Sequence, residues 1–334
     1  MRFVISKKEE ILCNLFCTIF SINFDKKRRL DSMKWLNKAI LTMMPLIPKF
    51  FVGMVAKKYI AGVTMEEAIV KVKTLNQQGF VFTMDVLGES VTKKEEALEP
   101  LRMYMEVLEA IHKEKLDGNI SLKLTQFGLN IDPEFCWENL KIILDKAKVY
   151  NIFVRIDMED SSVTDLTLDI YRRAKAYYSN VGTVIQGYLH RSADDVQKLV
   201  KDGVNLRICK GIYKESYNIA FQDRNEVRDN TINLIRYMLN HNQYVAIASH
   251  DLQIINEMRQ YIDNKGFPRD RYEFQSLLGV PIDNTLKDLL ANGYKVRYYV
   301  PFGTEWYAYS TRRLYENPDL GGYIFKDFFK FWKS

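Results

Sequence analysis

Short apolar runs alternate with longer amphipathic stretches along the chain from residue 80 onward. The apolar runs are rich in β-branched and aromatic residues, which is typical of buried strands. The stretches between them, such as 133–150 and 227–242, carry apolar residues every three to four positions and predict helices. The predicted strands are 80–88, 119–126, 152–159, 181–189, 204–211, 244–251, 272–279 and 295–303.

This alternation predicts an α/β fold. Strands that alternate with helices at this spacing form βαβ units and a parallel sheet. Eight such units favour a closed (β/α)8 barrel of the TIM type over an open doubly wound sheet. We expect residues 80–334 to form this barrel as the catalytic domain, with a C-terminal helix, and residues 1–79 to form an N-terminal helical segment.

The N-terminal segment contains two apolar stretches. Residues 11–24 are shorter than the roughly 20 residues that a membrane-spanning helix needs, and they lack the features of a signal peptide. Residues 34–58 are basic, amphipathic and interrupted by Pro45 and Pro48. That pattern is typical of helices packed on the outside of a domain, or of peripheral contact with a membrane. Met33 is an alternative start, in which case residues 1–32 are not part of the native protein.

Charged residues recur inside the predicted strands, where apolar residues are expected. Lys123 stands between Leu122 and Leu124, and burying an ammonium group is costly unless it is paired or used. Side chains alternate between the two faces of a strand, so Lys123 should face the barrel interior when both leucines face the helices. The polar residues predicted to converge at one mouth of the barrel are Lys123, Arg155, Asp157, Gln186, Arg207, Lys210, Arg297 and Tyr299. Structural ion pairs are the alternative interpretation of any one of them.

Composition excludes several classes of protein. The net charge is +6, and basic and acidic residues are interleaved almost everywhere, so we expect no nucleic-acid partner. The four cysteines form no CxxC pair, and no His/Cys cluster has metal-site spacing. We expect reduced cysteines, no metal and a cytoplasmic protein, with attachment to the inner face of the cell membrane as the alternative.

Common catalytic motifs are missing from the sequence. It has no HxH pair, GxGxxG, Walker A or GxSxG motif, which argues against metal hydrolysis, a Rossmann cofactor site and a nucleophile elbow. A Schiff-base aldolase remains an alternative, because Lys123 or Lys210 inside an apolar barrel could become a neutral nucleophile. The many cations at the predicted mouth are better suited to an anionic substrate or cofactor.

A predicted helix at residues 305–318 follows the last strand. Arg312 and Glu316 are four positions apart, and Arg313 and Glu316 are three apart, so one carboxylate can hold both guanidinium groups. Paired arginines over a barrel mouth suit a carboxylate ligand. A solvated charged helix face is the alternative interpretation.

Several segments together resemble the proline dehydrogenase family in its short monofunctional bacterial form. They cover every predicted strand in the family's order. The segments are MDVLGESV (84–91), SLKLTQFGL (121–129), RIDMEDS (155–161), VIQGYLHRSADD (184–195), LRICKGIYKE (206–215), ASHD (248–251), YEFQSLLG (272–279) and RYYVPFGTEWYAYSTRRLYENP (297–318).

The resemblance implies a (β/α)8 barrel that holds FAD at the carboxyl ends of its strands. It also implies oxidation of L-proline to 1-pyrroline-5-carboxylate, with a hydride passing from the ring to flavin N5 and electrons leaving to a membrane quinone. By resemblance, the proline carboxylate would be bound by Lys123, Arg312 and Arg313, with Glu316 orienting the two arginines. Tyr213 and Tyr299 would pack on the ring, with Ile208 nearby.

The resemblance assigns the remaining site residues to the cofactor. Asp157 would hold Arg313 or the flavin edge, Arg207 would reach flavin N5, and Gln186 would bind the pyrimidine side. The rest of the FAD would be lined by Met158, Lys210, Gly211, Ile212, Ser249 and His250.

Three positions depart from the family pattern. Ile212 stands where the family usually has alanine, Ser249 where it has threonine, and Leu278 where tyrosine is common. None of these changes removes a proposed catalytic group. They leave a preference for hydroxyproline as an alternative.

Overall fold

The computed structural model describes residues 58–88, 90–307 and 309–311. The chain divides into two compact units, and all described residues except Thr311 belong to the unit Lys49–Ser310. The basic stretch at 34–58, except Lys58, and the alternative start at Met33 lie outside the described residues. The division into segments 1–79 and 80–334 stays a prediction.

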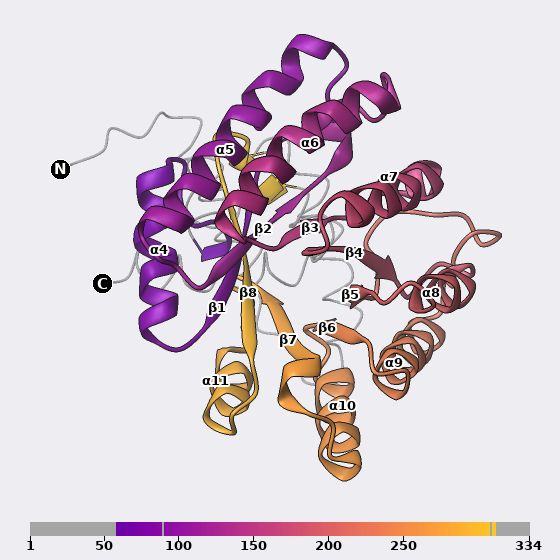
Figure 1. The fold of residues 1–334 in the computed structure, drawn as a ribbon. Helices are drawn as coiled ribbons and strands as arrows, with labels where there is room; N and C mark the ends of the chain where they lie inside the picture. Colours follow the sequence, from indigo (N-terminus) through magenta and orange to yellow (C-terminus); the bar gives the residue numbers. More distant parts are fainter. Residues whose placement is uncertain (1–57, 89, 308, 312–334) are drawn as a thin grey trace, which may run out of the picture. The chain divides into compact units, whose positions relative to one another are not determined.

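Eight parallel strands form a closed barrel in chain order, which confirms the predicted fold class (Figure 1). Each strand pairs with its sequence neighbours, and β1 closes the barrel on β8, with Val81 opposite Arg297 and Val86 opposite Phe302. The strands are β1 Val81–Val86, β2 Gly118–Leu122, β3 Val154–Ile156, β4 Val181–Gln186, β5 Asn205–Cys209, β6 Tyr244–Ala248, β7 Tyr272–Leu277 and β8 Val296–Phe302.

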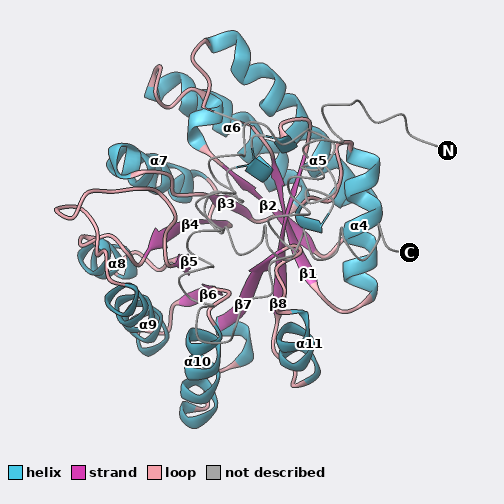
Figure 2. Cartoon of the chain, turned by 180° about the vertical axis from the view of Figure 1, so that it is seen from behind, coloured by secondary structure: helices cyan, strands magenta, loops and turns pink. Residues whose placement is uncertain are grey.

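The helices surround the strands (Figure 2). The α-helices are α4 Met65–Gln77, α5 Leu98–Lys113, α6 Pro133–Tyr150, α7 Thr164–Tyr177, α8 Ser192–Val200, α9 Arg224–Asn240, α10 Leu252–Lys265 and α11 Asp283–Ala291. Short 3-10 helices are η3 Lys94–Ala97, η4 Leu124–Phe127, η5 Ser161–Val163 and η6 Arg269–Arg271. None of the helices within these residues is long and apolar enough to cross a membrane.

Local sequence signals explain where the helices begin and end. Asp132 caps α6 by accepting hydrogen bonds from the backbone N–H groups of Glu134 and Phe135. The helix ends at Asn151, which adopts a left-handed conformation with φ of 52°. Gly266 ends α10 in the same way with φ of 66°. These turns return the chain to the amino end of the next strand.

Every strand ends earlier than the apolar pattern predicts. The predicted strand 119–126 stops at Leu122, and Leu124–Phe127 continues as η4 with all four side chains buried. Gly128, with φ of 92°, closes this turn. A buried irregular segment carries the same apolar pattern as a strand, which is why the pattern overshoots. The residues predicted as strand but not found in strands therefore lie just after the carboxyl ends of the strands, where the polar side chains described below are located.

The main core lies between the strands and the helices. Leu122, Ile156, Leu206 and Ile208 belong to one apolar cluster with residues of the surrounding helices. Arg207 has the opposite strand parity to Leu206 and Ile208, and its side chain lies with the polar residues inside the barrel. The predicted alternation of faces therefore explains how charged residues enter these strands.

Candidate active site

Lys123 is the centre of a charged cluster at the carboxyl ends of the strands. It follows directly after β2, and its Nζ lies 2.7 Å from Asp85 Oδ1 on β1. The same Nζ lies 3.6 Å from Asp157 Oδ2 and donates to Tyr299 Oη at 3.3 Å. The Lys123 side chain is 20% exposed, whereas that of Asp85 is only 2% exposed. The ammonium group is thus paired and partly open to the mouth.

Electrostatics favour the charged forms of Lys123 and Asp157, whereas burial raises the pKa of Asp85 above its ordinary value. Burial alone would lower the pKa of Lys123, but the attraction of Asp85 and Asp157 outweighs it and raises this pKa above its ordinary value. Burial would raise the pKa of Asp157, but the positive charges of Arg207 and Lys123 lower it overall. Burial and the nearby Asp157 raise the pKa of Tyr299, which keeps this phenol a hydrogen-bond donor.

Arg207 on β5 is held on two sides. Its Nε donates to Gln275 Oε1 at 2.7 Å, and its Nη1 donates to Asp157 Oδ1 at 2.7 Å and to Ser121 Oγ at 3.2 Å. The guanidinium carbon lies 5.1 Å from the centre of the Tyr299 ring. Its Nη2 is buried and has no hydrogen-bond partner in this part of the chain. Among the described residues, nothing engages this donor nitrogen, so it is available to a ligand.

Three further predicted residues lie at or beside the carboxyl ends of their strands. Gln186 ends β4, and its Nε2 donates to the backbone oxygen of Glu159 at 2.7 Å. Met158, which follows β3, is buried. His250 follows β6, and its Nε2 accepts a hydrogen bond from the backbone N–H of Leu277 at 3.0 Å. This acceptor role places the imidazole proton on Nδ1 when the ring is neutral.

A second cluster of cations surrounds Asp251, the residue before α10. Its Oδ2 lies 3.2 Å from Lys210 Nζ and 3.0 Å from Arg228 Nε. The backbone N–H of Asp251 also donates to Ser249 Oγ at 3.1 Å. Gly211 adopts a φ of 104°, which side chains rarely tolerate. Two cations share one carboxylate here, so the cluster has an excess of positive charge.

The loop after β5 carries the last described candidates. Ile212 is exposed, so its side chain is accessible to a ligand. Tyr213 packs against the small apolar cluster of Tyr188, Leu189 and Ala220. Its phenol is close enough to Lys123 to make a minor contribution to raising the pKa of that lysine. Arg312, Arg313 and Glu316 lie outside the described residues, so their roles stay predictions.

The prediction that Arg155 and Arg297 lie at this mouth is wrong. Arg297 donates to both carboxylate oxygens of Glu273, at 2.8 and 3.0 Å, and Arg155 binds the backbone and side chain of Asn205. Asn205 begins β5 and Glu273 lies near the start of β7, so both arginines turn toward the amino ends of the strands. A Cβ at Gly182 would lie 2.5 Å from Arg155 Nη1, so glycine makes room for this side chain.

Sequence reasoning missed several partners in the site. Asp85 has apolar neighbours in β1, and Glu273 and Gln275 flank an apolar residue in β7. The alternation of faces that identifies Lys123 also marks these three residues as inward-facing. Ser121 and Arg228 carried no such signal, because a small hydroxyl residue and a charged helix residue are common anywhere.

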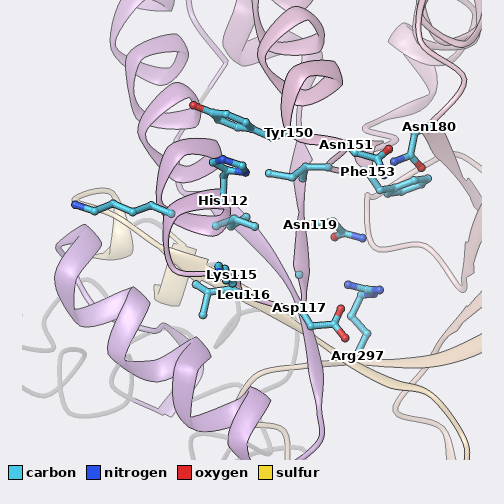
Figure 3. Close-up of a pocket in the computed structure, with 14 residues that line it drawn as sticks. His112, Lys115, Leu116, Asp117, Asn119, Tyr150, Asn151, Phe153, Asn180 and Arg297 are labelled. Carbon is cyan, nitrogen blue, oxygen red and sulfur yellow. The ribbon is translucent and has the colours of Figure 1, made fainter.

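A pocket of about 600 Å³ lies at the amino ends of the strands. It is lined by the last turns of α5 and α6, including His112 and Tyr150, by the loops before β2, β3 and β4, including Asp117, and by Arg297 (Figure 3). Reactions on this fold occur at the carboxyl ends of the strands, and Arg297 is already bound by Glu273. The pocket is therefore separate from the charged cluster. Within the described residues, no group of three or more His, Cys, Asp or Glu side chains could hold a metal ion.

Comparison with known proteins identifies the family. The family model described as "Proline dehydrogenase" matches residues 68–322. The chain belongs to the proline dehydrogenase family. It is 39% identical over 275 residues to proline dehydrogenase 1 of Bacillus subtilis subsp. natto, covering 82% of this chain and 91% of that protein. It is 33% identical over 280 residues to proline dehydrogenase of Deinococcus radiodurans, covering 82% and 90%.

Solved structures of larger proteins share the proline dehydrogenase fold. Proline utilization A from Bdellovibrio bacteriovorus, inactivated by N-propargylglycine, aligns with a TM-score of 0.77 at 23% identity. The alignment covers 93% of this chain and 40% of that one, so this chain spans well under half of the larger protein. The family resemblance inferred from the strand-end motifs is confirmed by the family match.

Proposed function

We propose that this protein is an FAD-dependent dehydrogenase that oxidises L-proline to 1-pyrroline-5-carboxylate. Membership of the proline dehydrogenase family supports this function. The structural observation that carries it is the cluster of Lys123, Asp85, Asp157, Tyr299 and Arg207 at the carboxyl ends of the barrel strands. Its two cationic side chains, Lys123 at the mouth and Arg207 beside it, are hydrogen-bond donors suited to a substrate carboxylate and to a hydride-accepting cofactor.

The described residues fit FAD. Arg207 Nη2 is buried and has no partner among the residues that the structure describes, and a flavin ring nitrogen needs such a donor. Lys210 and Arg228 share the single carboxylate of Asp251, so their excess positive charge suits a pyrophosphate. FAD supplies the hydride acceptor, and a nearby cation stabilises the negative charge of its reduced form. The residues proposed to line it are Met158, Gln186, Arg207, Lys210, Gly211, Ile212, Ser249 and His250.

The substrate carboxylate requires more positive charge than Lys123 provides. Asp85 and Asp157 already face Lys123, at 2.7 and 3.6 Å. We propose that Arg312 and Arg313 supply the additional cations, with Glu316 orienting them, and that Lys123 approaches the same carboxylate from the barrel. Tyr299 and Tyr213 are proposed to pack on the proline ring. Ile208 is not, because its side chain belongs to the core between the strands and the helices. Asp157 positions Arg207 and Tyr299 by accepting a hydrogen bond from each.

The alternative chemistries have less support. A Schiff-base aldolase needs a neutral lysine, whereas paired carboxylates raise the pKa of Lys123. The proline dehydrogenases that the chain resembles give no support to a preference for hydroxyproline. Oxidation of proline is therefore the function that the site supports best.

We propose further that electrons leave to a membrane quinone, and that the protein is cytoplasmic with peripheral contact at the inner face of the cell membrane. The basic amphipathic stretch 34–58 supports this, because each lysine near an anionic surface contributes about 1 kcal/mol. Co-sedimentation with anionic liposomes at low salt should detect the contact and lose it at high salt. No binding at low salt would argue for a soluble acceptor.

The visible absorption spectrum tests the proposed function. The purified protein should be yellow, alone or after incubation with FAD, and anaerobic L-proline should bleach the flavin bands. The matched control is D-proline, which has the same ring and charges in the opposite hand and should bleach the bands far more slowly. A protein that shows no flavin spectrum after incubation with FAD would overturn the proposal.

A further inference from the structure

A continuous series of hydrogen bonds between buried side chains leads from Arg207 toward the amino ends of the strands. Arg207 Nε donates to Gln275 Oε1 at 2.7 Å, and Gln275 Nε2 donates to Glu273 Oε1 at 2.5 Å. Glu273 in turn accepts from Arg297 Nε at 2.8 Å and from Arg297 Nη2 at 3.0 Å. The far end is anchored where Arg297 Nη1 donates to the backbone oxygen of Phe82 on β1, at 2.6 Å. The series thus links β5, β7, β8 and β1 through the barrel.

Glu273 determines which way the amide of Gln275 faces. A carboxylate accepts hydrogen bonds and cannot donate them, so it selects the NH2 group of the amide. The amide oxygen must then face Arg207, which can only donate. Without Glu273, the amide could turn its NH2 group toward the guanidinium and repel it.

The four side chains of this hydrogen-bonded series are buried. Glu273, Gln275, Arg207 and Arg297 are all buried, with at most 6% of their surface exposed. Two of the three guanidinium nitrogens of Arg207 are bound, Nε by Gln275 and Nη1 by Asp157, which fixes the plane of the group. The direction of the third nitrogen, Nη2, which no described residue contacts by a hydrogen bond, follows from that plane.

We propose that Gln275 and Glu273 are positioning residues that aim Arg207 Nη2 at the bound flavin and so raise its reduction potential. This inference rests on the proposed function, because it requires FAD at the mouth of the barrel. Neither residue contacts the substrate in this account. They act because a cation held at a fixed position stabilises a reduced, negatively charged flavin more than a cation free to move.

The variant Gln275→Met keeps the side-chain length and removes both hydrogen bonds of the amide. We expect the reduced flavin to be bound about tenfold less tightly relative to the oxidised flavin, which lowers the midpoint potential by about 30 mV for a two-electron couple. The control is Thr83→Val, which removes a buried side-chain hydrogen bond to Asn119 inside the same barrel without touching Arg207. Its potential should equal that of the parent protein.

Spectroelectrochemical titration of the three FAD-loaded proteins measures these potentials. A Gln275→Met protein with the potential of Thr83→Val would overturn the inference. If Gln275→Met does not fold, the double variant Glu273→Met/Arg297→Met removes the acceptor of Gln275 without leaving a buried charge unpaired between these two positions. It should show the same fall, and a parental potential would overturn the inference equally. A parent protein that binds no FAD would instead contradict the proposed function.

Discussion

At the scale of single residues, the charge of Lys123 depends on its neighbours. An ammonium group in a barrel interior is stable only when carboxylates compensate for lost hydration. Asp85 is the nearer partner at 2.7 Å, and Asp157 lies at 3.6 Å while also holding Arg207. Asp85 therefore decides whether Lys123 stays charged and in place.

Asp85→Asn should lower both stability and substrate binding. Breaking a buried ion pair costs about 3 kcal/mol at the low end of the usual range, which suits a lysine that is partly exposed. We expect that loss in the free energy of urea-induced unfolding, together with a higher KM for proline. Asp165→Asn is the control, because its carboxylate pairs with Arg191 on the surface and should cost less than about 1 kcal/mol. Equal losses in the two variants would contradict the account.

The paired arginines give a second prediction at this scale. Arg312→Met or Arg313→Met should reduce kcat/KM for proline about 10- to 150-fold, because each charge-assisted hydrogen bond contributes roughly 1.5–3 kcal/mol. FAD binding, measured by the visible spectrum, should survive. If both variants keep near-parental kcat/KM, the carboxylate clamp is wrong.

At the scale of elements, the alternation of faces predicted which strand residues enter the barrel but not how deep they lie. Lys123 and Arg297 both have inward parity, yet Lys123 reaches the carboxyl mouth and Arg297 binds Glu273 near the amino ends. Strands in a barrel are tilted and staggered, so depth depends on register with distant strands. That register, and the pairing of Lys123 with Asp85 and of Arg207 with Gln275, came only from the structure. Fold class needed no such information, because it follows from the alternation of strands and helices.

Glu215 ties the loop between β5 and α9 to the start of η5, the 3-10 helix that follows β3. Its carboxylate accepts from the Ser161 backbone N–H and from Ser161 Oγ, each at 2.8 Å. The same loop carries Tyr213, which is proposed to pack on the proline ring. Glu215→Gln should therefore loosen Tyr213 and raise the KM for proline about 3- to 10-fold.

Steady-state kinetics can grade this effect. Ser161→Ala removes one of the two hydrogen bonds and should raise KM less than Glu215→Gln. Glu226→Gln, at an exposed position on α9, should leave KM unchanged. A KM for Glu215→Gln equal to that of Glu226→Gln would show that the tie does not position the loop.

At the scale of the whole molecule, the buried charges make stability depend on pH. Burial would raise the pKa of Glu273, but Arg297 outweighs it and lowers the pKa from its ordinary 4.5 to about 2. A carboxylate whose pKa is lower in the folded state than in the unfolded state stabilises the fold at pH values above its unfolded-state pKa. This stabilisation is lost as the pH falls through the folded-state pKa. The pKa of Asp157 is also lowered, chiefly by Arg207 and Lys123, so Asp157 contributes to stability in the same direction.

The free energy of unfolding should therefore fall by about 3 kcal/mol through Glu273 as pH drops from 4.5 to about 2. The double variant Glu273→Gln/Arg297→Met should show a shallower fall over this range, whatever its stability at neutral pH. Urea unfolding at a series of pH values measures both slopes. Parallel curves for the two proteins would contradict the role of Glu273.

The central claim is that Lys123 and its charged neighbours at the carboxyl mouth bind proline beside FAD. Anaerobic titration with L-proline, followed through the visible flavin bands, tests it most directly in the parent and in Lys123→Met. We expect proline to reduce the flavin of the parent, and Lys123→Met to bind FAD but to need at least about tenfold more proline. Equal proline dependence in the two proteins, or a parent flavin that proline does not reduce, would contradict the account.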